Sequence, residues 1–315
     1  MDTPDSQFAS GLRCWKIFLG LIFLQLPLFA YGANDLRVLV VLSESTTPYQ
    51  SFSKTFQQAL PSNFQVSELQ HPESFSVKDN QADLVVTVGV KATDWMIGKS
   101  TVPLLAVMIP STKYVDLLET QARSSHISAI YIDQPWSRQV ALLHAALPES
   151  RNIGVLYSSE ARLNLQTLRN ELAWHGFSLV AKQMQNNENL SSDLEEVLAH
   201  SDVLLAVPDG NIFSSGSIRN ILLSSYRQRI PLVGLSQAYV NAGALCAVFS
   251  TPEQLAAQAG TETILFARTR RLPDPQSPAF YTIAVNQDVA RTLDITTKSA
   301  DFLHMQVEKE SRVPR

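Results

Sequence analysis

The chain has 315 residues, of which 25 are basic and 29 acidic, so its formal net charge at pH 7 is -4. This weak acidic balance argues against nucleic acid as a partner. The length exceeds what one hydrophobic core usually organises, which excludes a single small domain.

The first 32 residues have the pattern of a cleavable signal peptide. Two basic residues precede an apolar run at 17–29, and the tripeptide AYG at 30–32 places small side chains where a signal peptidase reads. The run is too short to cross a hydrocarbon core of about 30 Å as a helix. Because Cys14 precedes the run and no cysteine follows it directly, we expect cleavage after Gly32 and a periplasmic protein without a lipid anchor.

Short apolar runs of strand length then alternate with segments of helical spacing, which is typical of parallel sheets covered by helices. The runs predict strands at 36–42, 64–69, 84–88, 104–109 and 127–132, and a second series at 153–157, 178–182, 203–207, 231–234, 245–249 and 281–285. Helical spacing predicts helices that include 52–60, 136–147, 163–175, 190–200, 217–228 and 252–266. We therefore expect an α/β fold of two hinged, Rossmann-like lobes, each with a parallel sheet flanked by helices.

The C-terminal part contains a predicted connector and a polar tail. Residues 268–278 are proline-rich and polar, which indicates a connection between elements, and residues 297–315 are expected to fray. Cys246 is the only cysteine beyond the expected signal peptide, so no internal disulfide is expected. Its apolar neighbours predict a buried, inert thiol.

Open α/β sheets bind ligands beyond the carboxyl ends of their strands, so the loops there hold the candidate ligand-binding residues. The first such loop offers hydroxyls ahead of a helix, whose ordinary use is capping. It contributes Ser43, Ser45, Thr46, Thr47 and Tyr49. Gly89 and Val90 follow the third strand, where a glycine either brings a ligand to the backbone or makes a tight turn. Ser111 follows the fourth strand.

Two later strand ends add four candidates. Asp209 and Asn211 follow the eighth strand, in a segment whose composition is also that of a plain turn. If Asp209 offsets the charge of an amine-bearing ligand, Asp209→Ala is expected to weaken binding at least about tenfold. Unchanged affinity would leave Asp209 a turn residue. Ser236 and Gln237 follow the end of the ninth strand and are also polar candidates for ligand binding.

The sequence contains no complete catalytic, metal-binding or cofactor-binding motif. The segment around Ser236 lacks the last residue of the nucleophile-elbow pattern, and His304 is the only histidine after it. The 6 histidines show no pairing at metal-ligand spacing. His175 and His200 end predicted helices, where a cation favours the helix dipole. We therefore expect neither an enzyme nor a bound metal or cofactor.

The order and spacing of several segments carry a family resemblance. They are NIGVLY at 152–157, AVPD at 206–209, IPLVGLS at 230–236 and VNAGAL at 240–245, with further matches at 83–89, 102–107, 258–260, 284–286 and 290–295. Over nearly the whole chain after the expected signal peptide, this pattern resembles the tryptophan- and tyrosine-type branch of ABC-transporter substrate-binding proteins. That family has the type I periplasmic-binding fold.

The resemblance implies two lobes joined by three crossovers, with a solute trapped between them by hinge closure. The crossovers would fall near 132–135, 237–243 and 273–278. Residues 33–132 and about 243–274 would then form the first lobe, and residues 133–242 and about 275–296 the second, before the polar tail at 297–315.

The resemblance also implies a function, the periplasmic solute-binding component of an ABC-type importer. The expected ligand is a small polar or amphipathic solute such as an amino acid, the expected partners are a membrane permease and its ATPase, and we expect a monomer. The chain departs from its relatives at MIPS (108–111), where they commonly have an Asp-Pro type of loop, and at Gln237, where they often have an acid. The alternative is a periplasmic sensor or adaptor that uses the same fold to signal to a membrane partner.

Overall fold

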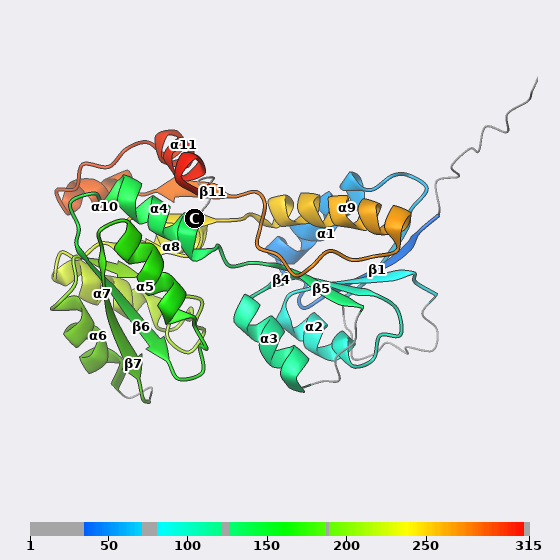
Figure 1. Cartoon of the computed structure of the whole chain (residues 1–315), viewed down its shortest axis with the longest axis horizontal. Coiled ribbons are helices and arrows are strands. Elements are labelled where there is room, and N and C mark those ends of the chain that lie inside the picture. Colours follow the sequence, from blue (N-terminus) through cyan, green and yellow to red (C-terminus); the bar gives the residue numbers. More distant parts are fainter. Residues whose placement is uncertain (1–34, 71–80, 121–125, 187–188, 312–315) are drawn as a thin grey trace, which may run out of the picture. The chain divides into compact units, whose positions relative to one another are not determined.

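The computed structural model describes residues 35–70, 81–120, 126–186 and 189–311. The expected signal peptide lies outside these residues. Within them the chain forms two β-sheets, each covered by helices, and we call each sheet with its helices a lobe (Figure 1). No helix in these ranges is long and apolar enough to span a membrane.

The first lobe contains a five-stranded parallel sheet in the order β2-β1-β3-β4-β5. Its strands are β1 (Arg37–Leu42), β2 (Gln65–Leu69), β3 (Leu84–Val88), β4 (Leu104–Ile109) and β5 (Ile127–Tyr131), and its helices are α1 (Thr47–Ala59), α2 (Val90–Ile97), α3 (Ser111–Thr120) and α9 (Pro252–Thr269). Along β1, Val38 and Val40 pack with α1 and α9, whereas Leu39 and Val41 pack with α2 and α3. This alternation buries both faces of the sheet.

The second lobe contains a six-stranded sheet in the order β11-β10-β9-β8-β6-β7. Its strands are β6 (Asn152–Ser158), β7 (Ser178–Met184), β8 (Val203–Leu205), β9 (Leu232–Gly234), β10 (Cys246–Phe249) and β11 (Thr282–Val285). Its helices are α4 (Trp136–Ala146), α5 (Leu165–Trp174), α6 (Leu190–Leu198), α7 (Ile218–Arg227), α8 (Gln237–Ala242), α10 (Gln287–Thr292) and α11 (Ala300–Ser311). All pairs are parallel except β10 with β11.

The predicted α/β architecture of two sheets is confirmed. Every predicted strand is present, with ends that differ by at most two residues. The prediction of a buried thiol is also confirmed, because Cys246 lies within β10 and burial raises the pKa of its thiol to about 12. Helices α2, α3, α8, α10 and α11 were not predicted, since they are short or carry mostly polar residues.

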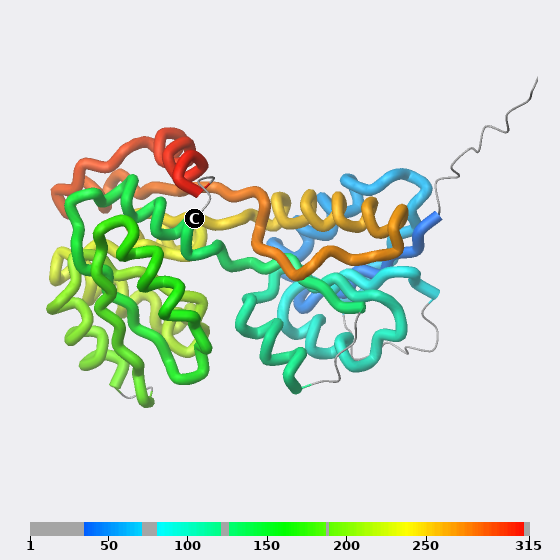
Figure 2. The backbone as a smooth tube through the Cα atoms, in the orientation of Figure 1, coloured from blue at the N-terminus to red at the C-terminus, as the bar shows by residue number. Residues whose placement is uncertain are grey.

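The boundary between the lobes differs from the expectation in one place. The chain passes to the second sheet after β5, returns to α9 after β10, and passes again between α9 and β11 (Figure 2). Assignment of residues 243–274 to the first lobe is therefore wrong for β10, which pairs with β9 and β11. The expected crossover at 237–243 is instead α8, ended by Gly243 at a φ of 122°, and the chain then re-enters the same sheet.

The expectation that residues 297–315 fray is wrong for residues 300–311, which form α11. Helix α11 packs against α4 and β11. Leu303 and Val307, four residues apart on one helix face, are fully buried. The exposed side chains of Phe302 and Met305 and the many charges around them hide this narrow apolar face in the sequence.

Helix α9 begins with a capping box next to the connection from β10. The Thr251 hydroxyl accepts a hydrogen bond from the Gln254 N–H at 3.2 Å, and the Gln254 side chain accepts one from the Thr251 N–H at 3.0 Å. Thr251→Ala is expected to lower the free energy of unfolding by about 1 kcal/mol, measured by urea denaturation. The matched control is Thr261→Ala, an exposed residue inside the same helix, which is expected to change stability by less than about 0.5 kcal/mol. Equal losses would contradict a capping role.

Candidate functional site

A cavity of about 380 Å³ is lined by residues that follow strands of both sheets. The first lobe contributes the end of β5 and the start of α3, and the second contributes the β6–α5 loop and Pro208 after β8. Residues 134–136 and Ser277, from two of the connections between the sheets, complete the lining together with α4. Carboxyl ends of parallel strands are where open α/β sheets bind ligands.

A carboxylate and a hydroxyl meet inside this cavity. Because β4 and β5 are neighbours in the sheet, the residues that follow them, Ser111 and Asp133, come together. The N–H of Ser111 donates to Asp133 Oδ1 at 2.7 Å, and its hydroxyl donates to Oδ2 at 2.6 Å. Burial raises the pKa of Asp133, although the hydrogen bonds from Ser111 oppose that rise. The carboxylate therefore carries a poorly solvated charge that a bound cation would offset.

Aromatic and aliphatic side chains make up much of the remaining lining. Tyr131 ends β5, and its ring packs edge-on against Tyr114 with 5.8 Å between the ring centroids. Trp136 begins α4, and Val115 and Leu163 add aliphatic surface from opposite lobes. A cavity that joins apolar surface to a few polar groups suits an amphipathic solute.

Arg162 brings a positive charge to the cavity from the second lobe. It lies in the β6–α5 loop with a φ of 47°, in the left-handed region that few non-glycine residues adopt. Its guanidinium pairs with Asp116 at 3.1 Å and with Glu119 at 2.5 Å, both on α3 of the first lobe. Because the Arg162 side chain is 56% exposed, these pairs contribute little to stability, and exchanging one for a solute carboxylate costs little.

Groups from all three connections between the sheets hydrogen-bond beside the cavity, as side chains in the first two and as main-chain carbonyls in the third. Gln134 Nε2 donates to Ser250 Oγ at 2.8 Å, and Ser250 Oγ donates to the Phe280 carbonyl at 2.5 Å. Arg138 donates to Gln134 Oε1, and to the Pro278 carbonyl at 3.0 Å. Gln134 and Ser250 are buried, so water does not compete for these hydrogen bonds. Since Gln134 also lines the cavity, the network joins the connections to the site.

Four of the predicted site residues gather at a different strand end. The hydroxyl of Ser43 accepts a hydrogen bond from the Ala92 N–H at 2.9 Å, which caps α2. Gly89 has a φ of 89°, and Val90 begins α2 directly after it. A Cβ at Gly89 would lie 2.7 Å from Ser43 Oγ and 2.9 Å from the Tyr49 hydroxyl, so the first loop touches this turn. Capping and a tight turn account for the contacts of Ser43 and Gly89, and none of the four residues lines the 380 Å³ cavity.

The other first-loop candidates, Ser45, Thr46 and Thr47, are exposed at the start of α1. Thr46 is the N-cap residue but makes no side-chain capping hydrogen bond. The Ser45 carbonyl accepts a hydrogen bond from Gln50 Nε2 at 2.9 Å. A ligand role for these three residues stays a prediction.

Gly89→Ala is expected to lower the free energy of unfolding by about 1–3 kcal/mol, because it forces a side chain into a left-handed conformation. It also places a Cβ 2.8 Å from Tyr49 Cε1. Gly176→Ala is the matched control, since Gly176 has a φ of 78° but nothing within 4 Å of the added Cβ. Urea denaturation of both variants separates the two effects. If Gly89→Ala lowers the free energy of unfolding no more than Gly176→Ala does, the loop that contains Ser43 and Tyr49 moves aside for the added Cβ.

Asp209 is buried, and its carboxylate is engaged by the backbone. Oδ2 accepts a hydrogen bond from the Ser158 N–H at 2.6 Å, and Oδ1 accepts one from the Asn211 N–H at 3.0 Å. Asn211 donates in turn to Ser158 Oγ at 3.3 Å and to Glu160 at 3.0 Å. Asp209 thereby ties the end of β8 to the end of β6, which favours the turn alternative over solute contact. Its neighbour Pro208 lines the cavity instead.

The last two candidates lie at the start of α8. Ser236 is its N-cap residue and is partly buried, with no side-chain capping hydrogen bond. Gln237 is exposed and donates to Asn241 Oδ1 at 2.9 Å. Neither residue lines the 380 Å³ cavity.

Among the predicted site residues, Ser111 alone lines this cavity in the described part of the chain. The residues missed by sequence reasoning include Tyr131, Asp133, Trp136 and Arg162. Tyr131 ends β5, and the other three follow β5 or β6, so the same strand-end rule applies to all four residues. Asp133 lies within 132–135, the segment that the sequence predicts as a crossover between the lobes.

A sequence model of ABC transporter substrate binding proteins matches residues 69–303. The chain belongs to this family. The match confirms the resemblance stated from the sequence, and family membership implies a small-molecule ligand and transporter partners for this substrate-binding protein. A comparison with curated proteins gave no match.

Solved structures share the fold of this substrate-binding protein at low sequence identity. One is an ABC domain from Streptococcus pneumoniae in complex with L-Trp, with 16% identity, a TM-score of 0.62, and coverage of 88% of this chain and 98% of that one. Another is a ligand-free, open substrate-binding protein with adhesive properties from Clostridium difficile, with 16% identity, a TM-score of 0.68, and coverage of 84% and 96%. A conserved domain protein from Vibrio cholerae has 18% identity, a TM-score of 0.61, and coverage of 86% and 98%.

Proposed function

We propose that this protein is the solute-binding component of an ABC-type importer. It captures a small amphipathic solute that bears an amine, such as an amino acid or a related compound, and delivers it to a membrane permease and its ATPase. Membership in the ABC transporter substrate-binding family supports this role. The sequence pattern of the first 32 residues supports export to the periplasm with cleavage near Gly32 and without a lipid anchor.

The observation that carries the proposal is the Asp133 carboxylate in the amphipathic cavity. Ser111 holds both carboxylate oxygens by its N–H and its hydroxyl, at 2.7 and 2.6 Å, which fixes their orientation. Burial raises the pKa of Asp133, and the hydrogen bonds from Ser111 offset only part of that rise, so a positive charge on the solute would favour the ionised form. An ammonium group supplies the missing charge, and an anionic solute would add repulsion.

Arg162 and the aromatic residues of the cavity also fit the proposed solute. A zwitterionic solute would meet the carboxylate of Asp133 just after β5 and the guanidinium of Arg162 in the β6–α5 loop. Tyr131 and Trp136 offer apolar surface to its side chain. The complex of the Streptococcus pneumoniae relative with L-Trp supports an aromatic amino acid as the first solute to test.

The direct experiment is native mass spectrometry of the protein without residues 1–32, purified without refolding so that a retained solute is detected. Thermal-shift measurements then compare amino acids, including aromatic ones, with neutral sugars and organic acids. Amine-bearing compounds are expected to raise the unfolding temperature, because they bind the folded state. No shift with any compound would remove the support for solute capture. A shift with sugars alone would overturn the assignment of an amine-bearing solute.

A further inference from the structure

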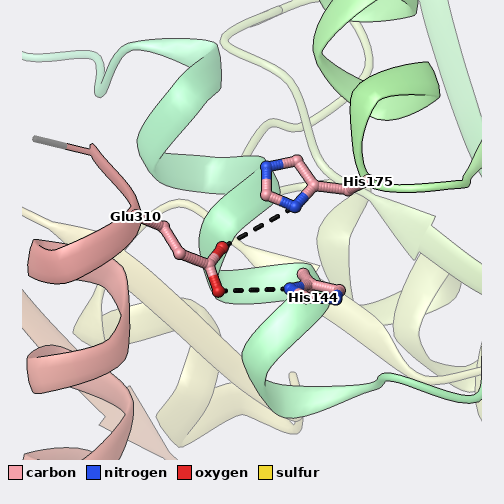
Figure 3. A group of neighbouring side chains, drawn as sticks. All are labelled: His144, His175 and Glu310. Carbon is pink, nitrogen blue, oxygen red and sulfur yellow. Dashed lines mark hydrogen bonds and ion pairs between the residues drawn. The ribbon is translucent and has the colours of Figure 1, made fainter. Parts of the chain in front are cut away.

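Two histidines and a glutamate from three helices meet in the second lobe (Figure 3). His144 lies in α4, His175 is the C-cap residue of α5, and Glu310 lies in α11. His144 Nδ1 lies 3.2 Å from Glu310 Oε1, and His175 Nδ1 lies 3.7 Å from Glu310 Oε2. Figure 3 shows both imidazoles turned toward the carboxylate. The sequence showed no such pairing, because the three residues are far apart along the chain.

Hydrogen bonds within the described residues satisfy this cluster only in part. Glu310 Oε2 and His175 Nε2 are both buried, and neither has a hydrogen-bond partner there. The His175 side chain is 9% exposed, and burial lowers its pKa, with Glu310 opposing and His144 adding to the decrease. The cluster therefore keeps buried polar atoms without a partner among the described residues, which is rare in folded proteins.

We propose that His144, His175 and Glu310 bind a divalent transition-metal ion of the zinc type. Imidazole nitrogens and a carboxylate oxygen are ligands that Zn²⁺ accepts, with bonds of about 2.0–2.2 Å and a fourth position open to water. Tetrahedral ligands at such bond lengths lie roughly 3.4 Å apart. The three available ligand atoms lie within 4.8 Å of one another, so small side-chain rotations complete the site.

The surroundings of the cluster fit this assignment. The ring of Phe177 packs edge-on against His144, with 6.2 Å between the ring centroids, and is itself buried. An apolar wall of this kind limits access of water to a metal site. The His144 side chain is 44% exposed, which leaves a path for the ion to enter. A bound ion links α11 to α4 and α5, so it fastens the C-terminal helix to the second lobe.

The test uses the protein without residues 1–32 and without an affinity tag, stripped with EDTA and then dialysed. Zn²⁺ is titrated by isothermal calorimetry, and Co²⁺ is added separately because its visible spectrum reports coordination geometry. The wild-type protein is expected to bind a single equivalent of Zn²⁺ and to unfold at a higher temperature with it. The variants Glu310→Gln and His144→Gln are expected to bind it more than about tenfold more weakly. His200→Gln is the matched control, since His200 follows α6 and its Nδ1 lies on the Glu196 carbonyl, and this variant is expected to bind Zn²⁺ as wild type does.

His144→Gln keeps the test decisive if other variants fold poorly, because His144 is the most exposed of the three residues. Circular dichroism establishes that each variant is folded. Failure of the wild type to bind Zn²⁺ would overturn the proposal and leave the cluster as an ion pair that holds α11. Unchanged affinity in folded His144→Gln and Glu310→Gln would also overturn it, since the ion would then bind elsewhere. Solute affinity is expected to be the same with and without Zn²⁺, so this result is independent of the proposed function.

Discussion

Replacing Asp133 by asparagine is expected to weaken the binding of an amine-bearing solute by at least about thirtyfold, or about 2 kcal/mol or more. The substitution removes the negative charge while keeping an oxygen that accepts the hydrogen bond from the Ser111 N–H. An ammonium group in the cavity would then be desolvated without a counter-charge. Isothermal calorimetry with the solute identified by native mass spectrometry measures the loss.

Two further measurements separate a binding role of Asp133 from a structural one. Because burial raises its pKa, solute affinity is expected to fall as the pH is lowered through that raised pKa, and Asp133→Asn should abolish this dependence.

The stability of the solute-free protein changes in the opposite sense, since the folded state holds the proton more tightly than the unfolded state and loses stability as the pH rises. Asp133→Asn is therefore expected to unfold at a higher temperature than wild type at neutral pH. Glu160→Gln, an exposed acid on the β6–α5 loop, is the control for charge alone. Unchanged affinity in Asp133→Asn would contradict the assigned role.

Asp209→Ala is expected to act on stability instead, lowering the free energy of unfolding by about 2–5 kcal/mol. Asp209 is 5% exposed, and its carboxylate accepts hydrogen bonds from the N–H groups of Ser158 and Asn211 at 2.6 and 3.0 Å. Removing the acceptor leaves both donors without their partner at the ends of β6 and β8. Urea denaturation at neutral pH measures the loss.

Asp209→Asn is the graded control, since an amide oxygen still accepts one hydrogen bond, and its loss is expected to be smaller. Asp301→Ala, an exposed acid in α11, is expected to change stability by less than about 0.5 kcal/mol. Solute affinity of folded Asp209→Ala is expected to stay close to wild type, in contrast to the tenfold loss that the sequence alone suggested. A tenfold loss of affinity at unchanged stability would show instead that Asp209 contacts the solute.

The sequence by itself determined the two-sheet α/β architecture. Parallel strands buried on both faces are apolar on both faces, so the local sequence is enough to predict strands such as LVVTV at 84–88. The predicted ends of the strands were correct to within two residues for the same reason. The family could also be recognised, because it depends on the order and spacing of such segments along the chain.

Only the tertiary structure decided which polar residues line the candidate site. Asp133 and Asp209 both follow strands, yet one faces a cavity beside Ser111, and the other is satisfied by two backbone N–H groups. This difference depends on which strand ends are neighbours in a sheet and how the chain leaves them. Three other features also depend on which elements are neighbours in space. They are the placement of β10, the packing of α11 and the contact of His144 with Glu310. Contacts between residues far apart in sequence are set by packing, and local patterns of residues do not encode them.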